Sequence, residues 1–133
     1  MKITQALLDD LTARAKESPR LRMNLDLRNS PEDQSQRMLN AVEPGSMIPI
    51  HRHPHSSETV VCLRGRILEE FYDVSGLPME TVELAPGSPV VALNIPAGAW
   101  HTARALESGT VILETKDGKY GPETSEELTA SNH

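Results

Sequence analysis

The chain has 133 residues, a length that suits one domain and is too short for two domains of ordinary size. Nineteen acidic residues against thirteen basic ones give a formal net charge of −6. A negative surface repels phosphate backbones, and the few aromatic residues, one Phe, one Trp and two Tyr, offer little surface for base stacking. We therefore expect no nucleic-acid partner.

The apolar content, counted with alanine but without glycine, is 38%, which is enough for a core. No apolar run approaches the roughly 20 residues that cross a bilayer. Unlike a signal peptide, the N-terminal segment carries acidic side chains among its apolar residues and has no small-residue cleavage site. Cys62 is the single cysteine, which excludes an internal disulfide and suits a reducing compartment. We expect a cytoplasmic protein with no membrane partner.

Residues 3–17 predict a short amphipathic helix, because their apolar positions recur at helical spacing and Thr4 can cap the start. Residues 20–28 instead predict a strand, in which leucine and methionine alternate with polar side chains. The polar face of this strand, which carries Arg22 and Asn24, either meets solvent, the commoner case, or lines a pocket.

Short apolar segments follow at close, regular spacing, with glycine and proline turn signals between them. We expect strands at about 34–42, 47–53, 58–63, 66–73, 79–84, 89–95, 99–106 and 110–116. Such a series indicates an all-β sandwich or barrel. We expect one domain over residues 1–133, with the barrel at about 20–116 and a polar tail at 117–133.

The segment between Gly45 and Gly65 concentrates the residues that carry chemistry. Side chains two apart on a strand share a face, so His51 and His53 lie roughly 6.5–7 Å apart at their Cα atoms and can converge on one ion. Glu58 opens the next apolar run, and an antiparallel return would bring its carboxylate to the same point. His101, far downstream, is a fourth candidate. The pattern predicts a metal site inside a small β-barrel.

Two motifs resemble those of the cupins, small jelly-roll barrels that hold a metal with three histidines and a glutamate. The first, G-x5-H-x-H-x4-E-x6-G from Gly45, matches at every spacing. The second, P-x-G-x-x-H at 96–101, departs from the family pattern, because eight residues instead of five separate Gly87 from Pro96 and Ala105 replaces a frequent asparagine. The resemblance implies a cupin jelly-roll barrel with a short N-terminal helix. It implies the metal ligands His51, His53, Glu58 and His101.

A wider stretch, from about residue 20 to residue 122, resembles the WbuC family of cupin-fold metalloproteins. It includes LRMN, QRMLNAVEPGSMIPIHRH and AGAWHTARALESGTVILETKDGKYGP. Members of that family are associated with bacterial surface-polysaccharide gene clusters, and their reaction is unassigned. The resemblance therefore supports the fold and the metal and leaves the substrate open.

Three imidazoles and one carboxylate leave one or two positions open on a five- or six-coordinate ion, as in non-haem iron enzymes. We expect one divalent transition metal per chain, and iron, manganese, nickel and zinc all accept this ligand set. Cys62 lies about 13 Å along the strand from Glu58, too far to bind the same ion, so we interpret it as a core thiol.

Several polar residues are candidates for contacts to a substrate: Arg22, Asn24, Asp26, Gln36, Arg37, His55 and Tyr120. Arg37 lies in an apolar strand, where it either lines the cavity and binds an anionic group, such as a carboxylate or sugar phosphate, or pairs with an acidic neighbour at the surface. His55 follows a turn at Pro54 and lines the mouth of the site or meets solvent. Tyr120 could close over the cavity from the tail.

These residues lead to two functional hypotheses of different classes. The first is a small metal-dependent enzyme that acts on a polar, carbohydrate-type molecule, as an isomerase, an epimerase or an oxygen-dependent enzyme. The second is a non-catalytic, metal-containing module that binds a sugar or metabolite. A purely structural metal in a filled barrel is a third possibility. The cupin resemblance implies a homodimer, and the helix at 3–17 could cover a sheet edge.

Overall fold

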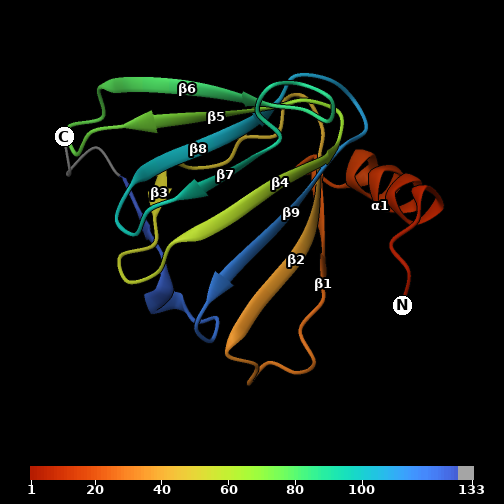
Figure 1. Cartoon of the computed structure of the whole chain (residues 1–133), viewed down its shortest axis with the longest axis horizontal. Coiled ribbons are helices and arrows are strands. Elements are labelled where there is room, and N and C mark those ends of the chain that lie inside the picture. The colour runs from red at the N-terminus through yellow and green to blue at the C-terminus, as the bar shows by residue number, and fades with distance from the viewer. Residues whose placement is uncertain (129–133) are drawn as a thin grey trace.

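The computed structural model describes residues 1–128 and contains two antiparallel five-stranded sheets with a helix outside them (Figure 1). The first sheet has the order β1-β2-β9-β4-β7 and the second the order β10-β3-β8-β5-β6. The helix α1 spans Gln5–Glu17. The strands are Arg22–Asp26 (β1), Ser35–Val42 (β2), His51–Arg52 (β3), Glu58–Arg64 (β4), Ile67–Tyr72 (β5), Pro78–Leu84 (β6), Ala92–Ile95 (β7), Trp100–Ala105 (β8), Thr110–Asp117 (β9) and Glu126–Glu127 (β10).

The connectivity of the eight strands from β2 to β9 is that of a jelly roll. The chain crosses from one sheet to the other at every step except the β5–β6 hairpin, which gives the neighbours β2-β9-β4-β7 in one sheet and β3-β8-β5-β6 in the other. β1 and β10 each extend one edge. The all-β jelly roll with a short N-terminal helix is thus confirmed.

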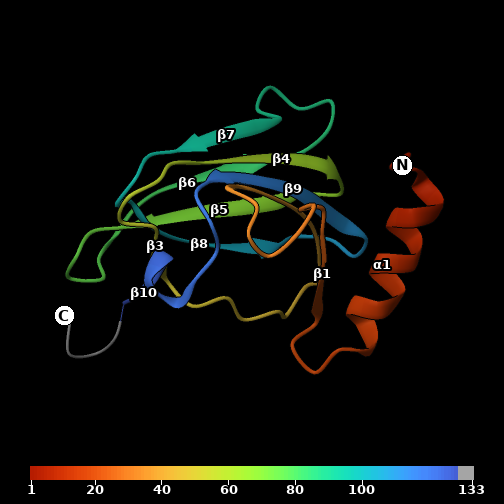
Figure 2. The ribbon, with the colours of Figure 1, turned by 90° about the horizontal axis from the view of Figure 1, so that it is seen from below.

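Helix α1 lies against the outer face of the first sheet (Figures 1 and 2). The Thr4 hydroxyl accepts a hydrogen bond from the backbone N–H of Leu7 at 3.2 Å and caps the helix. The buried helix residues Leu8, Leu11 and Ala15 pack on apolar residues of β2 and β9. The helix packs over the edge strand β1 and its neighbour β2, because its apolar stripe needs an apolar surface, and the sheet offers one on its outer face.

Truncation of Leu11 tests how strongly the helix is docked. Leu11 is 1% exposed, so Leu11→Ala should lower the free energy of unfolding by roughly 2–5 kcal/mol through lost burial and a cavity. Urea unfolding followed by circular dichroism measures the loss. Ile3→Ala is the control, because Ile3 precedes the helix and is 46% exposed. Equal losses in the two variants would contradict a docked helix.

The polar face of β1 is turned toward the space between the sheets. Met23 and Leu25 pack with the helix, so the alternating residues Arg22, Asn24 and Asp26 point the other way. These three residues line two pockets. Arg22 is partly buried, whereas Asn24 and Asp26 are exposed, so this face both lines pockets and meets solvent.

The interior changes from apolar at one end to polar at the other. The apolar end is filled by Val42, Val60, Cys62, Ile67, Leu84, Ile95, Ala105 and Ile112. Cys62 is buried there, as predicted for a core thiol. Along β9, Ile112 of this core is followed on the same face by Glu114, and along β5 Ile67 is followed by Glu69. The same strands thus carry both the core and the polar half of the interior.

The strand predicted at 47–53 is much shorter in the structure, where β3 comprises His51–Arg52 alone. Pro49 has no N–H to give to a ladder, and the carbonyl of Ile48 accepts a bond from the Thr102 hydroxyl at 2.6 Å instead. β10, within the polar segment after β9, pairs with β3 (Figure 2). The part of the chain that the structure describes contains no helix long and apolar enough to span a membrane.

Candidate metal centre

Three histidines from two neighbouring strands meet at the polar end of the interior. His51 of β3 is directly opposite His101 of β8 in the ladder, and His53 follows β3. One nitrogen from each ring can be chosen so that all three atoms lie within 4.8 Å of one another. His101 and His53 are 3% and 8% exposed. The strand alternation therefore places these residues together, as the motif predicts.

The hydrogen bonds of the three rings fix which nitrogen faces the centre. Each Nδ1 lies 2.9–3.0 Å from a backbone carbonyl oxygen. The carbonyls belong to Pro49, Thr124 and Ala99 for His51, His53 and His101, respectively. Because a carbonyl only accepts, each Nδ1 carries the hydrogen and donates it. In the neutral rings the Nε2 lone pairs are then available to a metal.

Glu58 of β4 adds a carboxylate to this cluster from the opposite sheet. Its Oε1 lies 3.3 Å from Nε2 of His101, and its Oε2 lies 3.6 Å from Nε2 of His53. Glu58 is 5% exposed. Lone pairs on nitrogen and oxygen repel at these distances unless a proton or a cation lies between them. The donor set therefore fits a divalent transition metal bound by three imidazoles and one carboxylate.

Lys116 of β9 is a charged neighbour of this cluster that the sequence analysis missed. Its Nζ lies 3.4 Å from Nε2 of His53 and donates to Oε2 of Glu58 at 3.5 Å. When no metal is bound, this ammonium group places a positive charge beside the buried carboxylate of Glu58.

Burial sets the protonation of the imidazoles. It lowers the pKa of His51 to about 4, with a further contribution from His101, and it lowers the pKa of His53, with a contribution from Lys116. Burial alone would also lower the pKa of His101, but the hydrogen bond to Glu58 raises it above its usual value. At neutral pH His51 and His53 are thus neutral and ready to bind a metal.

The carboxyl group of Glu58 is held in its charged form. Burial works to raise its pKa, but the hydrogen bond with His101 and the charge of Lys116 outweigh burial and bring the pKa below its usual value. A metal ligand must be deprotonated, and this environment keeps the carboxylate so.

A cavity of about 150 Å³ lies beside the histidines. It is lined by Arg22, Asn40, Ile48, His51, Glu58, Glu69, His101, Ala103, Ile112 and Glu114. Glu69, which is buried, and Glu114, which is partly buried, are two acids that the sequence does not single out. Burial raises the pKa of Glu69 to about 8, and burial together with Glu58 raises the pKa of Glu114 to about 7. Near neutral pH the carboxyl group of Glu69 is thus largely uncharged, whereas Glu58 in the same lining keeps its charge.

The remaining substrate candidates lie away from the histidines, except Arg22, which lines the 150 Å³ cavity. A second pocket of about 270 Å³ is lined by Asn24, Asp26, Arg28, Gln36, Arg37, Met38 and Tyr120. Arg37 forms an ion pair with Asp33 at 3.1 Å, the second alternative considered for it. His55 is exposed.

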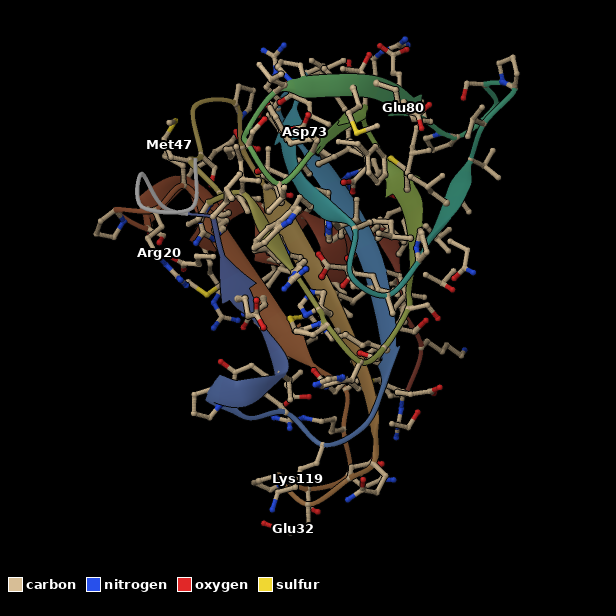
Figure 3. All side chains as sticks on the ribbon, turned by 90° about the vertical axis from the view of Figure 1, so that its left-hand side faces the viewer. Arg20, Glu32, Met47, Asp73, Glu80 and Lys119 are labelled. Carbon is tan, nitrogen blue, oxygen red and sulfur yellow. The ribbon has the colours of Figure 1, made fainter. Side chains whose placement is uncertain are left out.

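Tyr120 lies in the second pocket, 61% exposed, with the Arg28 guanidinium 5.8 Å from the centre of its ring. It therefore does not cover the histidines. Close to it in sequence, Lys119 pairs with Glu32 at 2.5 Å, and Figure 3 shows both residues at one end of the molecule. This ion pair joins the β1–β2 connection to the segment after β9.

Residues 3–84 match the profile of a family described as a domain of unknown function, DUF6016. The chain belongs to this family. A search of curated protein sequences finds no match. Solved structures give the fold: CapF, a capsular polysaccharide assembling protein from Staphylococcus aureus, aligns with a TM-score of 0.67 and 20% identity over 84% of this chain and 32% of that chain.

Two further similar structures come from other bacteria. Oxalate decarboxylase from Bacillus subtilis aligns with a TM-score of 0.60 and 20% identity over 80% of this chain and 27% of that one. KdgF from Halomonas sp. aligns with a TM-score of 0.58 and 16% identity over 77% of this chain and 84% of that one. All three have the cupin fold, and this DUF6016 member shares that fold. It spans about a third of the length of the CapF chain.

Proposed function

We propose that this DUF6016 protein binds one divalent transition metal through His51, His53, Glu58 and His101. The observation that carries the proposal is the hydrogen bonding of all three Nδ1 atoms to carbonyls, which leaves the Nε2 lone pairs beside a buried carboxylate. These backbone carbonyls are the second-sphere partners that orient metal-binding imidazoles. Iron, manganese, nickel and zinc are all compatible with these ligands.

We propose further that the metal site serves a small enzyme acting on a polar, carbohydrate-type molecule. When bound, the metal would supply Lewis-acid polarisation of a carbonyl or hydroxyl, or redox chemistry if it is iron. The cavity lined by Arg22, Glu69 and Glu114 provides a donor and two acids next to this point. The fold similarity to a capsular polysaccharide assembling protein and the resemblance to the WbuC family support a carbohydrate-type substrate.

The second candidate is a non-catalytic binding module, which the small size of the cavity favours. A space of about 150 Å³ accepts a small compound or one end of a larger one. Turnover of any compound in a panel of sugars and sugar nucleotides supports the enzyme, and tight binding without turnover supports the module. The homodimer implied by the cupin resemblance stays a prediction that sedimentation velocity tests.

Elemental analysis of protein purified without chelator or affinity nickel tests the metal site. We expect about one metal ion per chain in the wild type, and at least about a hundredfold weaker metal affinity in His51→Ala and His101→Ala, since each loses one of four ligands. His55→Ala is the control, because His55 is exposed. Folding of each variant is checked by circular dichroism.

The metal proposal has a clear negative outcome. If the folded wild type binds no ion after reloading with iron, manganese, nickel and zinc in turn, the cluster is not a metal site. If His55→Ala loses as much metal as His101→Ala, the ion binds elsewhere.

A further inference from the structure

Glu69 is an acid on the inner face of the barrel for which the fold offers no structural reason. It lies on β5 between the inward-facing Ile67 and Phe71, and it is 2% exposed. In the ladder Glu69 is opposite Ala103, two residues from His101, so it forms the next layer of side chains after the histidines. Its Oε2 is buried and has no hydrogen-bond partner.

Asn40 reaches the same cavity from the opposite sheet. Its Nδ2 donates to Oε1 of Glu114 at 3.4 Å, which turns its Oδ1 away from that partner. This Oδ1 is the second buried side-chain atom without a partner among the described residues. Asn40 and Glu69, the residues that carry these two atoms, both line the cavity beside His51 and His101.

Two polar atoms without hydrogen-bond partners in one cavity indicate a ligand that forms hydrogen bonds with both. A buried polar group without a partner costs free energy, so most such groups in folded proteins are paired. Asn40 Oδ1 is an acceptor and needs a donor. A carboxyl group accepts a hydrogen bond and, when protonated, also donates one. The group that satisfies both residues is a hydroxyl, which donates and accepts.

We propose that Asn40 and Glu69 recognise hydroxyl groups of a polyhydroxylated ligand, one end of which enters the cavity beside the histidines. This inference rests on the proposed function and adds the residues that bind the ligand. Binding of the ligand does not require the metal. Arg22, which lines the same cavity, contributes a donor for an oxygen of the ligand. It is already held by hydrogen bonds to Ser46 Oγ at 3.4 Å and the Met47 carbonyl at 3.0 Å.

The charge state of Glu69 supports this assignment. Burial raises the pKa of Glu69 to about 8; the charge of His101 opposes this shift, and the charges of Glu58 and Glu114 add to it. A neutral carboxyl group at pH 7 combines one donor with one acceptor, which suits an uncharged sugar or polyol. It also avoids repulsion from the neighbouring carboxylate of Glu58.

Nuclear magnetic resonance titrations of ¹⁵N-labelled protein test the proposal, with a panel of three- to six-carbon aldoses, ketoses and polyols as probes. Deoxy analogues of each probe that binds serve as ligand controls. We expect binding compounds to shift the side-chain amide signals of Asn40. We expect about tenfold to a hundredfold weaker binding in Asn40→Leu and Glu69→Met, because each loses one or more buried hydrogen bonds to the ligand.

Matched substitutions on one strand provide the protein control. Glu69→Gln keeps the side-chain volume and, like the neutral carboxyl group, presents one acceptor oxygen and one donor group, so its binding should stay within about fivefold of the wild type, in contrast to Glu69→Met. Glu70→Gln changes the neighbouring residue, which pairs with Arg104 on the outer face at 3.3 Å, and should bind as the wild type does. Wild-type affinity in both Glu69→Met and Asn40→Leu would overturn the assignment, and Asn40→Leu decides alone if Glu69→Met fails to fold.

The same titrations on metal-free protein separate this inference from the metal proposal. Binding that persists in metal-free protein and is weakened in Asn40→Leu supports recognition by these residues even if no metal ever binds. A wild type that holds one metal per chain but binds none of the hydroxyl compounds overturns the recognition proposal and leaves the metal site intact. The cavity would then hold water alone.

Discussion

Gly65→Ala is expected to destabilise the protein by more than about 3 kcal/mol, the range reached by severe steric clashes in a core. Gly65 lies between β4 and β5 with a φ of +81°, a conformation that L residues rarely adopt. An added Cβ would lie 2.6 Å from the Cα of Thr110, which is backbone and 0% exposed. The backbone of β9 would have to move, so the clash cannot be relieved by rotating a side chain.

Gly87→Ala separates the clash from the backbone strain. Gly87 has a similar φ of +77°, but no atom lies within 4 Å of the Cβ position, so we expect a loss of only about 1 kcal/mol. Urea unfolding of both variants at pH 7 gives the comparison. If the two losses agree within about 0.5 kcal/mol, the close approach of the β4–β5 turn to β9 does not matter for stability.

The fold could be predicted because its signals are local. Strict alternation in β1, the glycine and proline turns and the helical spacing in α1 each specify one element without knowledge of the partner strands. The motif around His51, His53 and Glu58 works in the same way, since two ligands share a strand and the third opens the next. His101 is a candidate from its residue type alone, and only the family resemblance joins it to the other three ligands, because 43 positions separate it from Glu58.

The acids and the lysine of the interior could not be predicted in this way. Glu114 and Lys116 lie in the polar second half of β9, with Thr115 and Asp117, and such a composition normally marks a solvent-exposed part of a strand. They point inward because β9 lies centrally in its sheet, between β2 and β4, and its other face is covered by the helix. Both residues lie on the same face of β9 as Ile112, two and four positions further along. This relation could have identified them, but only once Ile112 was known to be in the apolar core.

The polar segment after β9 also has a role that its composition concealed. The carbonyl of Thr124 accepts the Nδ1–H of His53 at 3.0 Å, and the N–H of Leu128 donates to the Ile50 carbonyl at 2.8 Å. A backbone carbonyl is available at any residue, so no side-chain pattern marks this contact. His133 lies outside the described residues.

Glu69→Gln is expected to reduce the pH dependence of stability of the metal-free protein between about pH 5 and 8. Burial raises the pKa of Glu69 from 4.5 to about 8, so across this window the folded protein holds a proton that the unfolded chain has released. The wild type should therefore lose stability as the pH rises, by up to about 1.4 kcal/mol per pH unit from this one group. A neutral glutamine removes that loss.

Urea unfolding at pH 5, 6, 7 and 8 in the presence of a chelator measures the two slopes. His51, whose pKa is lowered to about 4, contributes the opposite slope below its usual pKa, and Glu114, raised to about 7, adds to the loss. Both contributions are present in wild type and variant, so the difference between the two proteins isolates Glu69. Glu70→Gln should follow the wild type. Parallel curves for Glu69→Gln and wild type would mean that Glu69 is ionised inside the folded barrel, and the cavity would then be charged at neutral pH.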